Sequence, residues 1–438
     1  MVGIGRDEDM MNAPPAIAGP SQTTIEAVVN EIKESTDDIK LNESLKNIGG
    51  TPDMRELLLA SMLSSGQDPL ELLHIQDNTL GYLYILTARI NVPAAENPSI
   101  EVIQQFCSGI DPVKARLAPE RVTLLAKGIV TLFERSSNLD QCIPFLHDLL
   151  TRYPPSPNHL TTLHSTFARI CVSQKQFTTL LPILQEPITE IDTSISDIKY
   201  KDNLIYHYAG GVAFAALKQW TAAEGFFDIV VGSPAQLPSA IQLEALKKLA
   251  LVQLILYGKV KDVPKYVPQN LVAIFKKSPY GTLVTNYPLQ LEQLEKTLEK
   301  EENFFNSDKN LGLVKQVIAK ARRWAIKKLT ETYITLDLSD IGKEVGIEDE
   351  NEVRSVIDSM VEEGEINGTI SDDGTVTFED IPITFSKTEI DGLLITAQTQ
   401  DALLYEIDKK MARNRDFLNK ATRKHDAQDW GDEEYRGF

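Results

Sequence analysis

Apolar residues recur three and four positions apart along most of this chain, from Thr23 to Lys300. This spacing places them on one face of a helix, whereas the alternation typical of a strand is almost absent. Short segments rich in proline, glycine and serine interrupt the pattern, and they begin at Glu96, Arg152, Leu184, Gly232 and Lys277. The pattern predicts an all-helical region made of consecutive helix pairs.

One predicted pair lies in the stretch YHYAGGVAFAALKQWTAAEGFFDIVVGSP, which begins at Tyr206. It follows the tetratricopeptide pattern, in which small residues lie where two helices cross and large rings lie beside them. The first helix carries Tyr208, Gly211 and Phe214, the turn contains Trp220, and the second helix carries Ala223, Phe227 and Val230. We interpret these residues as packing between helices, and no residue marks a peptide groove.

Weaker copies of this turn occur near Leu139 and Phe177. The offsets between the three turns are irregular and longer than the roughly 34 residues of a standard repeat. The sequence therefore predicts a mainly α fold with a degenerate, right-handed tetratricopeptide-like solenoid over residues 23–300. Residues 1–22 lack the basic and apolar regions of a signal peptide and are predicted to be a disordered lead.

Residues 301–380 show a different order of elements. An amphipathic helix from Leu311 to Leu329 precedes a β-branched strand at Tyr333–Leu336. A two-turn helix with Ser339 as its N-cap and a longer helix with Asp349 at its start follow. The stretch EINGTISDDGTVTF then predicts a hairpin. Helix, strand, helix, helix, strand, strand is the order of a winged-helix module.

Many winged helices bind DNA, but the charge of this one argues against it. The chain carries 44 basic and 63 acidic residues, a net charge of -19. The predicted second helix and its lead-in, Glu348 to Glu363, carry seven acidic residues against Arg354 alone. The hairpin adds Asp372, Asp373, Glu379 and Asp380 and no basic residue. Since contacts with phosphate need cations, we predict that the module binds protein and not DNA.

One basic stretch lies in the helix before the predicted strand, and its members are Lys320, Arg322, Arg323, Lys327 and Lys328. A solvated helix face that offsets an acidic neighbour is the first interpretation. A docking patch for an acidic partner surface is the second, and an RNA-binding adaptor would use the same residues.

Motifs of common catalytic and metal sites, such as HExxH, GxxxxGK[ST] and GxSxG, do not occur in the sequence. His159 and His164 are five positions apart, so a helix would not direct both at one metal. The three cysteines lie far apart and are predicted to be core residues of a protein in a reducing compartment. The longest apolar stretch, Leu249 to Tyr257, is about half of what a bilayer crossing needs. We therefore predict no enzyme, cofactor, metal, small-molecule substrate or membrane contact.

A regular seven-residue pattern predicts a C-terminal helix over residues 386–423. Its seam consists of Ile390, Leu393, Ala397, Gln400, Leu404, Ile407, Met411, Asn414 and Leu418. A single helix cannot bury such a seam, so it must dock on the solenoid or on helices of other chains. The polar seam residues Gln400 and Asn414 favour a bundle with other chains. Residues 424–438 are acidic, lack a period and are predicted to be disordered.

A helical-repeat solenoid that leads into a winged helix and a terminal helix resembles the PCI family, which the proteasome lid, the signalosome and translation initiation factor three share. Four stretches resemble signalosome members in particular: IYHYAGGVAFAALKQWTAAEGFF, LEALKKLALVQLILYGKVKDVPKY, NLGLVKQVIAKARRWAIKKLTETYITLDLSDI and MVEEGEI. The resemblance is strong from Asn203 to Gly368 and absent from both ends of the chain.

The resemblance implies a non-catalytic scaffold subunit of the complex that removes a ubiquitin-like modifier from cullins and so regulates cullin-RING ubiquitin ligases. Its partners would be other PCI and metalloprotease-type subunits, with catalysis in the latter, in the cytoplasm and nucleus. Winged helices of this family join edge to edge, which implies the interface residues Tyr333, Ile334, Thr335, Ile366, Thr369, Val376 and Phe378. The alternatives are a scaffold subunit of the proteasome lid and an RNA-binding adaptor of the initiation-factor type.

Overall fold

The computed structural model describes residues 24–93, 95–235, 237–379 and 385–419, which form two compact units. The first comprises the described residues up to Lys328 together with Lys343–Ile347, and the second comprises Leu329–Gly342 and the described residues from Glu348 onward. The predicted lead and the predicted acidic tail lie outside the described residues. Within the described ranges, no helix is long and apolar enough to cross a bilayer.

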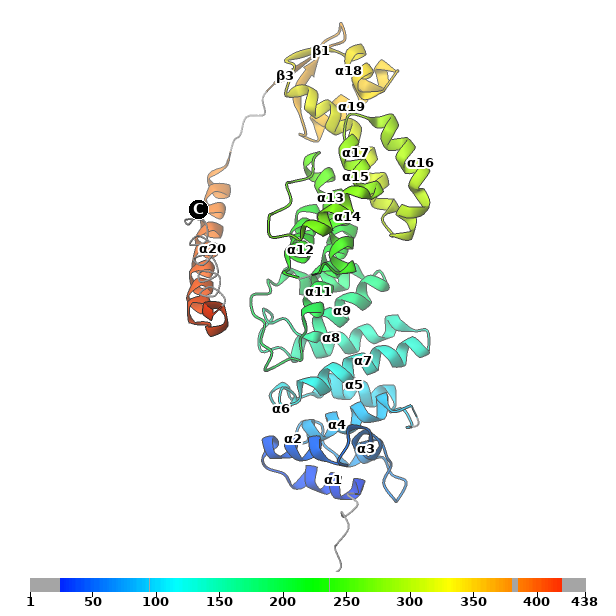
Figure 1. Cartoon of the computed structure of the whole chain (residues 1–438), viewed down its shortest axis with the longest axis vertical. Coiled ribbons are helices and arrows are strands. Elements are labelled where there is room, and N and C mark those ends of the chain that lie inside the picture. Colours follow the sequence, from blue (N-terminus) through cyan, green and yellow to red (C-terminus); the bar gives the residue numbers. More distant parts are fainter. Residues whose placement is uncertain (1–23, 94, 236, 380–384, 420–438) are drawn as a thin grey trace, which may run out of the picture. The chain divides into compact units, whose positions relative to one another are not determined.

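The first unit is helical (Figure 1). Its helices are α1 (Ile25–Glu34), α2 (Asp38–Asn47), α3 (Pro52–Leu59), α4 (Thr79–Asn91), α5 (Ile100–Gly109), α6 (Pro112–Ala115), α7 (Pro119–Arg135), α8 (Ile143–Arg152), α9 (Thr162–Ser173), α10 (Phe177–Gln185), α11 (Tyr200–Ala216), α12 (Trp220–Gly232), α13 (Ala240–Tyr257), α14 (Gln269–Lys277), α15 (Pro279–Asn286) and α16 (Leu291–Ser307), with short 3-10 helices at Pro69–Leu72 and Leu139–Cys142. Helix α17 (Leu311–Thr330) crosses into the second unit.

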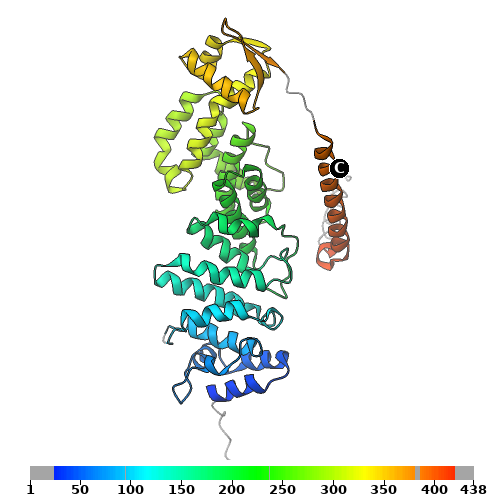
Figure 2. The same ribbon diagram turned by 180° about the vertical axis from the view of Figure 1, so that it is seen from behind.

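Helices that follow one another in the first unit pack side by side, as α11 does on α12 and α12 on α13 (Figures 1 and 2). Helix α11 also packs against α9, so each pair buries its apolar face on the next. The prediction of a mainly α fold with helical repeats is confirmed. The predicted limit of the solenoid at residue 300 lies inside α16, which continues to Ser307.

Helices α11 and α12 approach closely because small residues line their crossing. A Cβ added to Gly211 would lie 2.7 Å from the ring of Phe227, and one added to Gly210 would lie 2.6 Å from the ring of Phe226. Both distances are too short for a real side chain, so these glycines set the helix separation. The predicted arrangement of small and aromatic residues is confirmed, except that Trp220 begins α12 and is not part of the turn.

Four of the turns between helices share one backbone geometry. A positive φ of 56–58° occurs at Ser137, Lys175, Lys218 and Lys309. In the third of these turns, the N–H of Gln219 donates to the carbonyl of Phe214 at 2.9 Å, and the other three have the same five-residue bond. This is the Schellman arrangement that ends a helix. The predicted turns near residues 139, 177 and 220 are confirmed, and the fourth, before α17, is not among the predicted ones.

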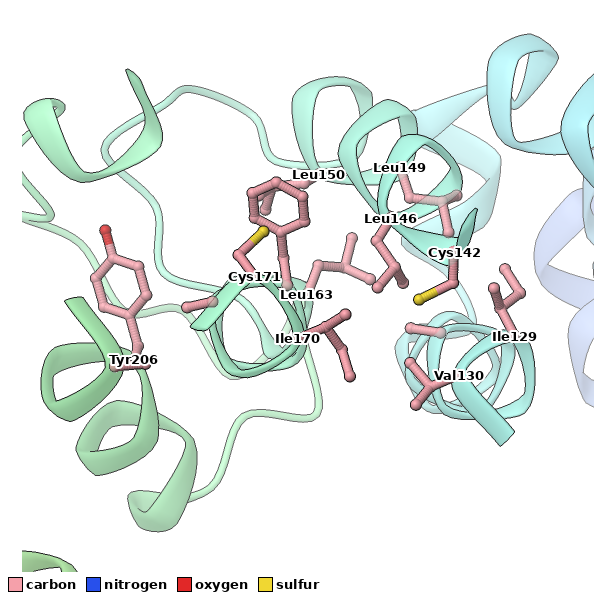
Figure 3. Packing of buried hydrophobic residues seen from close by; sticks show 14 of the residues in the cluster. Ile129, Val130, Cys142, Leu146, Leu149, Leu150, Leu163, Ile170, Cys171 and Tyr206 are labelled. Atoms are coloured by element: carbon pink, nitrogen blue, oxygen red, sulfur yellow. The ribbon is translucent and has the colours of Figure 1, made fainter. Parts of the chain in front are cut away.

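The cysteines lie in the core of the first unit. Figure 3 shows Cys142 and Cys171 among leucine, isoleucine and valine side chains of α7, α8 and α9. Burial raises the pKa of the Cys142 thiol to about 11 and that of the Cys171 thiol to about 12. Cys107 is also fully buried, and burial raises its pKa too. Their interpretation as core residues is confirmed.

The apolar stretch from Leu249 to Tyr257 forms the second half of α13, as expected of a buried helix. Gly258 ends this helix with a left-handed φ of 67°. Trp324 of α17 covers that end: its indole Nε1 donates to the carbonyl of Ile255 at 3.2 Å. Its ring lies so close that a Cβ on Gly258 would be 2.6 Å away. Helix α17 is therefore anchored on the end of α13.

The second unit contains a three-stranded antiparallel sheet with the order β1-β3-β2. Its elements are β1 (Thr335–Asp337), α18 (Leu338–Val345, which ends in the first unit), α19 (Glu350–Glu362), β2 (Asn367–Ile370) and β3 (Thr375–Glu379). Leu336 lies opposite Val376, and Thr369 lies opposite Thr377. Gly374, with a φ of 88°, allows the tight turn between β2 and β3. The predicted order of elements is confirmed.

Two details of this unit differ from the prediction. Strand β1 begins at Thr335, two residues later than predicted, and α18 begins directly after it at Leu338. Ser339 therefore lies inside α18 and is not its N-cap. The N-cap of α19 is Asp349 as predicted, and its carboxylate accepts from the N–H of Asn351 at 3.0 Å.

The C-terminal helix α20 (Lys387–Arg413) begins at a capping box. Ser386 Oγ accepts from the N–H of Glu389 at 3.3 Å, and the Glu389 carboxylate accepts from the N–H of Ser386 at 2.7 Å. The predicted helix over residues 386–423 is interrupted at Asn414; residues 415–419 are helical again, and residues 420–423 lie outside the described residues. Asn414 leaves the helix, and its side-chain oxygen accepts from the N–H groups of Asp416 and Phe417. Asn414 is therefore a cap and not a seam residue.

Candidate subunit interfaces

The edge of the sheet carries the first group of predicted interface residues. Among the described residues, β1 and β2 each pair with β3 alone, so each has a free edge. Ile334, directly before β1, is 77% exposed although its carbonyl accepts from the N–H of Phe378 at 2.8 Å. Tyr333, Thr335 and Thr369 are exposed as well. The backbone thus holds an apolar side chain rigidly in solvent, which is a typical anchor for a partner.

The other three predicted residues of this group, Ile366, Val376 and Phe378, are buried. Val376 and Phe378 are two positions apart on the central strand, so both side chains point to the same, inward face. These residues support the sheet from within and cannot touch a partner directly. The predicted surface is therefore reduced to Tyr333, Ile334, Thr335 and Thr369.

Helix α20 carries the second group, and none of its residues is buried. Its exposed seam residues include Ile390, Leu393, Leu404, Ile407 and Met411, and Leu418 beyond the break is exposed too. Leu404, for example, is 62% exposed. An isolated amphipathic helix of this kind is marginal in water, because its stability comes mainly from burial of the apolar face.

Sequence reasoning missed the apolar residues of α20 outside the seam, which are Leu394, Ile395, Leu403 and Tyr405, together with Phe385 before the helix. All of them are exposed. They widen the apolar surface beyond the narrow stripe that a two-stranded coiled coil buries. The signal was in the sequence, because these residues are visible as apolar positions that the seven-residue pattern leaves unexplained.

The basic stretch of α17 is mostly packed. Lys320, Arg322, Arg323 and Lys327 are half-buried and each interacts within the chain, as Lys327 does with the Trp324 ring at 5.0 Å. Lys328 alone of the five is exposed. This placement favours the structural interpretation over a free docking patch.

The acidic face predicted to repel DNA is at the surface of the second unit. Glu350, Glu352, Asp358 and Glu362 of α19 are exposed, whereas Val353, Ile357 and Met360 of the same helix are buried. Asp372 and Asp373 are exposed at the hairpin turn. The carboxylates of the helix that would enter a DNA groove therefore face solvent.

Charged groups buried in the first unit serve packing. Arg121 donates to both carboxylate oxygens of Glu56, at 2.6 and 2.8 Å, and lies over the ring of Tyr84 at 4.3 Å. Burial alone would raise the pKa of Glu56, but Arg121 and Arg55 together outweigh it and the pKa is lowered. Lys247 similarly binds Glu244 at 2.6 Å and Asp308 at 2.7 Å. These groups are satisfied, and the pairs Arg121–Glu56 and Lys247–Asp308 join segments far apart in the chain.

The histidines are not grouped for chemistry. His164 is buried, which lowers its pKa to about 4, and its Nδ1 accepts from the N–H of Thr161 at 3.1 Å at the start of α9. His159 lies 3.7 Å from Glu190. Across the described ranges, no three histidine, cysteine or carboxylate side chains are placed to hold a metal ion.

Sequence comparison with known proteins matches two successive stretches of the chain. A sequence-family model described as the N-terminal helical repeats of COP9 signalosome complex subunit 3 matches residues 43–271, and a PCI domain model matches residues 284–380. The protein named COP9 signalosome complex subunit 3 from Dictyostelium discoideum is 30% identical over 361 residues, which cover 80% of this chain and 86% of that protein. The protein of the same name from Drosophila melanogaster is 29% identical over 362 residues, which cover 76% and 80%.

The four stretches quoted above resemble subunit three of the constitutive photomorphogenesis-nine signalosome, and these matches confirm that prediction. The prediction of a PCI module is confirmed too.

Proposed function

We propose, because this chain belongs to the family of COP9 signalosome subunit 3, that it is a scaffold subunit of a signalosome, the multisubunit complex of that name. The single observation that carries the proposal is helix α20, whose apolar side chains are exposed over its whole length. Such a surface is unfavourable in water, and a subunit that is always part of a complex has partner helices to cover it.

The width of the apolar surface on α20 indicates the kind of partner. Residues of the seam, such as Leu404, and residues outside it, such as Ile395 and Tyr405, are all exposed. A single partner helix would cover only one stripe, so α20 is proposed to lie in a bundle with helices of at least two other subunits.

The sheet is proposed as the second contact. An edge strand offers unpaired backbone N–H and C=O groups, and Tyr333 and Ile334 add exposed apolar area beside β1. A winged helix of a neighbouring PCI subunit can pair with this edge. The acidic surface of α19 disfavours nucleic acid and is compatible with a protein neighbour.

The finer assignments are part of the proposal. The chain acts without an active site or a cofactor of its own and regulates cullin-RING ligases through the complex in which metalloprotease-type subunits carry the chemistry. It is located in the cytoplasm and nucleus. The proteasome lid is the weaker alternative because both relatives bear the signalosome name, and the RNA-adaptor alternative is weakened by the packing of the Arg322 stretch.

Capture of the tagged full chain from its own cells, followed by mass spectrometry, tests the assembly. We expect other PCI subunits and a metalloprotease-type subunit in stoichiometric amounts. Recovery of proteasome base subunits would indicate the lid instead, and recovery of ribosomal subunits would indicate an initiation factor.

A chain that ends at Phe385 tests the role of α20. We expect this truncated protein to fold with unchanged thermal stability, because no residue of α20 is buried, but to capture no partner. Unfolding of the truncated protein would show that α20 belongs to the chain's own core, and normal capture would show that the complex does not need the helix.

A further inference from the structure

A pocket of about 350 Å³ opens between α12, α13 and the loop over residues 260–264. The apolar side chains that line it include Val231, Leu249 and Val263. The carboxylates of Glu224, Asp228 and Asp262 line it as well. It lies wholly within the first unit. The contacts between helices described above do not use it.

Gly225 leaves this pocket open. It lies inside α12, where a glycine destabilises the helix relative to alanine. Gly210 and Gly211 have close neighbours that require their size, whereas a Cβ on Gly225 would meet nothing within 4 Å. Packing therefore does not require a glycine at this position, and the space where its side chain would lie belongs to the pocket.

One side of the pocket already binds a cation of the chain itself. The Glu224 carboxylate accepts from Lys261 Nζ at 2.8 Å, from the Tyr257 hydroxyl at 2.6 Å and from Gln253 at 3.0 Å. Lys261 Nζ also lies 4.2 Å from the centre of the Tyr257 ring. A carboxylate combined with an aromatic face is an arrangement that binds ammonium and guanidinium groups.

Asp228, one helical turn after Glu224, has no such partner. Asp228 is exposed and makes no hydrogen bond or ion pair with any described residue. Desolvation and the Glu224 charge raise its pKa, and the Lys261 charge acts against them. Three carboxylates thus line the pocket against the single cation of Lys261. The pocket therefore has a net negative charge beside its apolar side chains.

We propose that this pocket receives an arginine or lysine side chain of a partner polypeptide. The aliphatic stem packs on Val231, Leu249 and Val263, and the cationic head binds Asp228. The occupant is a polypeptide and not a small amine, because exposed apolar residues continue the surface beyond the pocket. Ile229 follows Asp228 on α12, and Tyr266, which is 66% exposed, lies 3.1 Å from the Cβ position of Gly232 at the end of the same helix.

The test uses the full chain with methyl-labelled valine and leucine, observed by NMR. The probes are a blocked pentapeptide with a central arginine between two leucines, the same peptide with citrulline in place of arginine, and N-acetyl-arginine amide. We expect saturable shifts at the methyl groups of Val231, Leu249 and Val263 with the arginine peptide, and binding weaker by about tenfold or more with the other two probes.

Three variants test the pocket, and a fourth is the matched control. Gly225→Leu fills the pocket and should abolish binding, whereas Gly312→Leu, at a helical glycine that also has open space, is the matched control and should bind normally. Asp228→Asn should weaken binding by about tenfold or more. Lys261→Ala should strengthen it, because it frees the Glu224 carboxylate while the backbone N–H of residue 261 still donates to Gln253.

The results decide the proposal in either direction. Loss of binding in Gly225→Leu together with a gain in Lys261→Ala supports it, because a pocket that is merely structural would not respond with opposite signs. No saturable shift with the arginine peptide up to about 10 mM overturns it. Equal affinity for N-acetyl-arginine amide overturns the polypeptide assignment and indicates a small cationic ligand.

Discussion

Position 258 requires glycine for two separate reasons: its backbone is left-handed, and the ring of Trp324 lies close to it. A side chain at a φ of 67° costs about 1 kcal/mol, and the Trp324 ring leaves no room for a Cβ. We expect Gly258→Ala to lower the free energy of unfolding by about 3 kcal/mol, measured by urea denaturation, since overpacking adds to the backbone cost.

Gly50→Ala is the matched control for this prediction. Its φ is 72°, but a Cβ there would meet nothing within 4 Å. It should lose only the backbone contribution of about 1 kcal/mol. Equal losses in the two variants would show that Trp324 does not press against the end of α13.

His164 predicts how acid affects the free chain. Because its pKa is about 4 in the folded chain and about 6.5 when unfolded, the unfolded chain binds the additional proton between these values. The contribution of His164 to the free energy of unfolding should therefore be fully present above pH 6.5. It should fall as the pH decreases toward 4, by up to about 1.4 kcal/mol per pH unit. His207, whose pKa burial also lowers, acts in the same direction.

The variant His164→Gln should remove this part of the acid sensitivity. A glutamine oxygen can still accept from the N–H of Thr161 but does not titrate. The difference in unfolding free energy between pH 7 and pH 5 should become smaller, because one group that takes up a proton on unfolding has been removed. An unchanged difference would contradict the assignment to His164.

Residues at the surface and in the core differ in how far the sequence predicts them. The ring and glycine pattern was sufficient to predict that Gly211 and Phe227 pack between two adjacent helices, although their direct contact is seen only in the structure. The burial of Val376 and Phe378 was not predicted as such, since the strand is short and only the sheet order shows which face is covered.

At the scale of elements, α20 gives the sharpest prediction. Leu404→Glu should leave the thermal stability of the free chain within about 0.5 kcal/mol, because the side chain is exposed, yet abolish capture of partner subunits. Thr399→Glu adds the same charge outside the seam, between Ile395 and Leu403 on the helix face, and should weaken capture less than Leu404→Glu does. For Leu404→Glu, thermal scans should therefore show unchanged stability, whereas mass spectrometry should show that the partner subunits are no longer captured.

Loss of capture in both variants would mean that added charge, and not the apolar seam, disrupts the assembly. Normal capture in both would remove α20 from the interface.

Element order could be predicted well, and element ends less well. The predicted seam ran through Asn414 because a period of seven does not distinguish a polar core residue from a cap. Strand β1 was placed two residues early because Tyr333 and Ile334 have strand propensity, although the register with β3 begins at Thr335 and Ile334 contributes only its carbonyl, to the N–H of Phe378. The pocket beside Gly225 was not predictable, since its walls come from two helices and a loop that only the fold brings together.

At the scale of the whole molecule, the net charge of -19 has a measurable effect. Like charges repel one another more in the compact state than in the extended chain. Raising NaCl from about 20 mM to about 300 mM shortens the screening length and should raise the melting temperature of the full chain by a few degrees. The same change in osmolarity made with an uncharged solute should have a much smaller effect, and a melting temperature that falls with salt would show that favourable ion pairs dominate.

The buried thiols also have a practical consequence. Cys107, Cys142 and Cys171 are all enclosed by apolar side chains and have raised pKa values, so they supply almost no thiolate at neutral pH. A single cysteine introduced at an exposed position would then be the one site that a maleimide dye modifies. The natural cysteines therefore need not be replaced before labelling, and docking of partners could be followed in real time with a dye on the introduced cysteine.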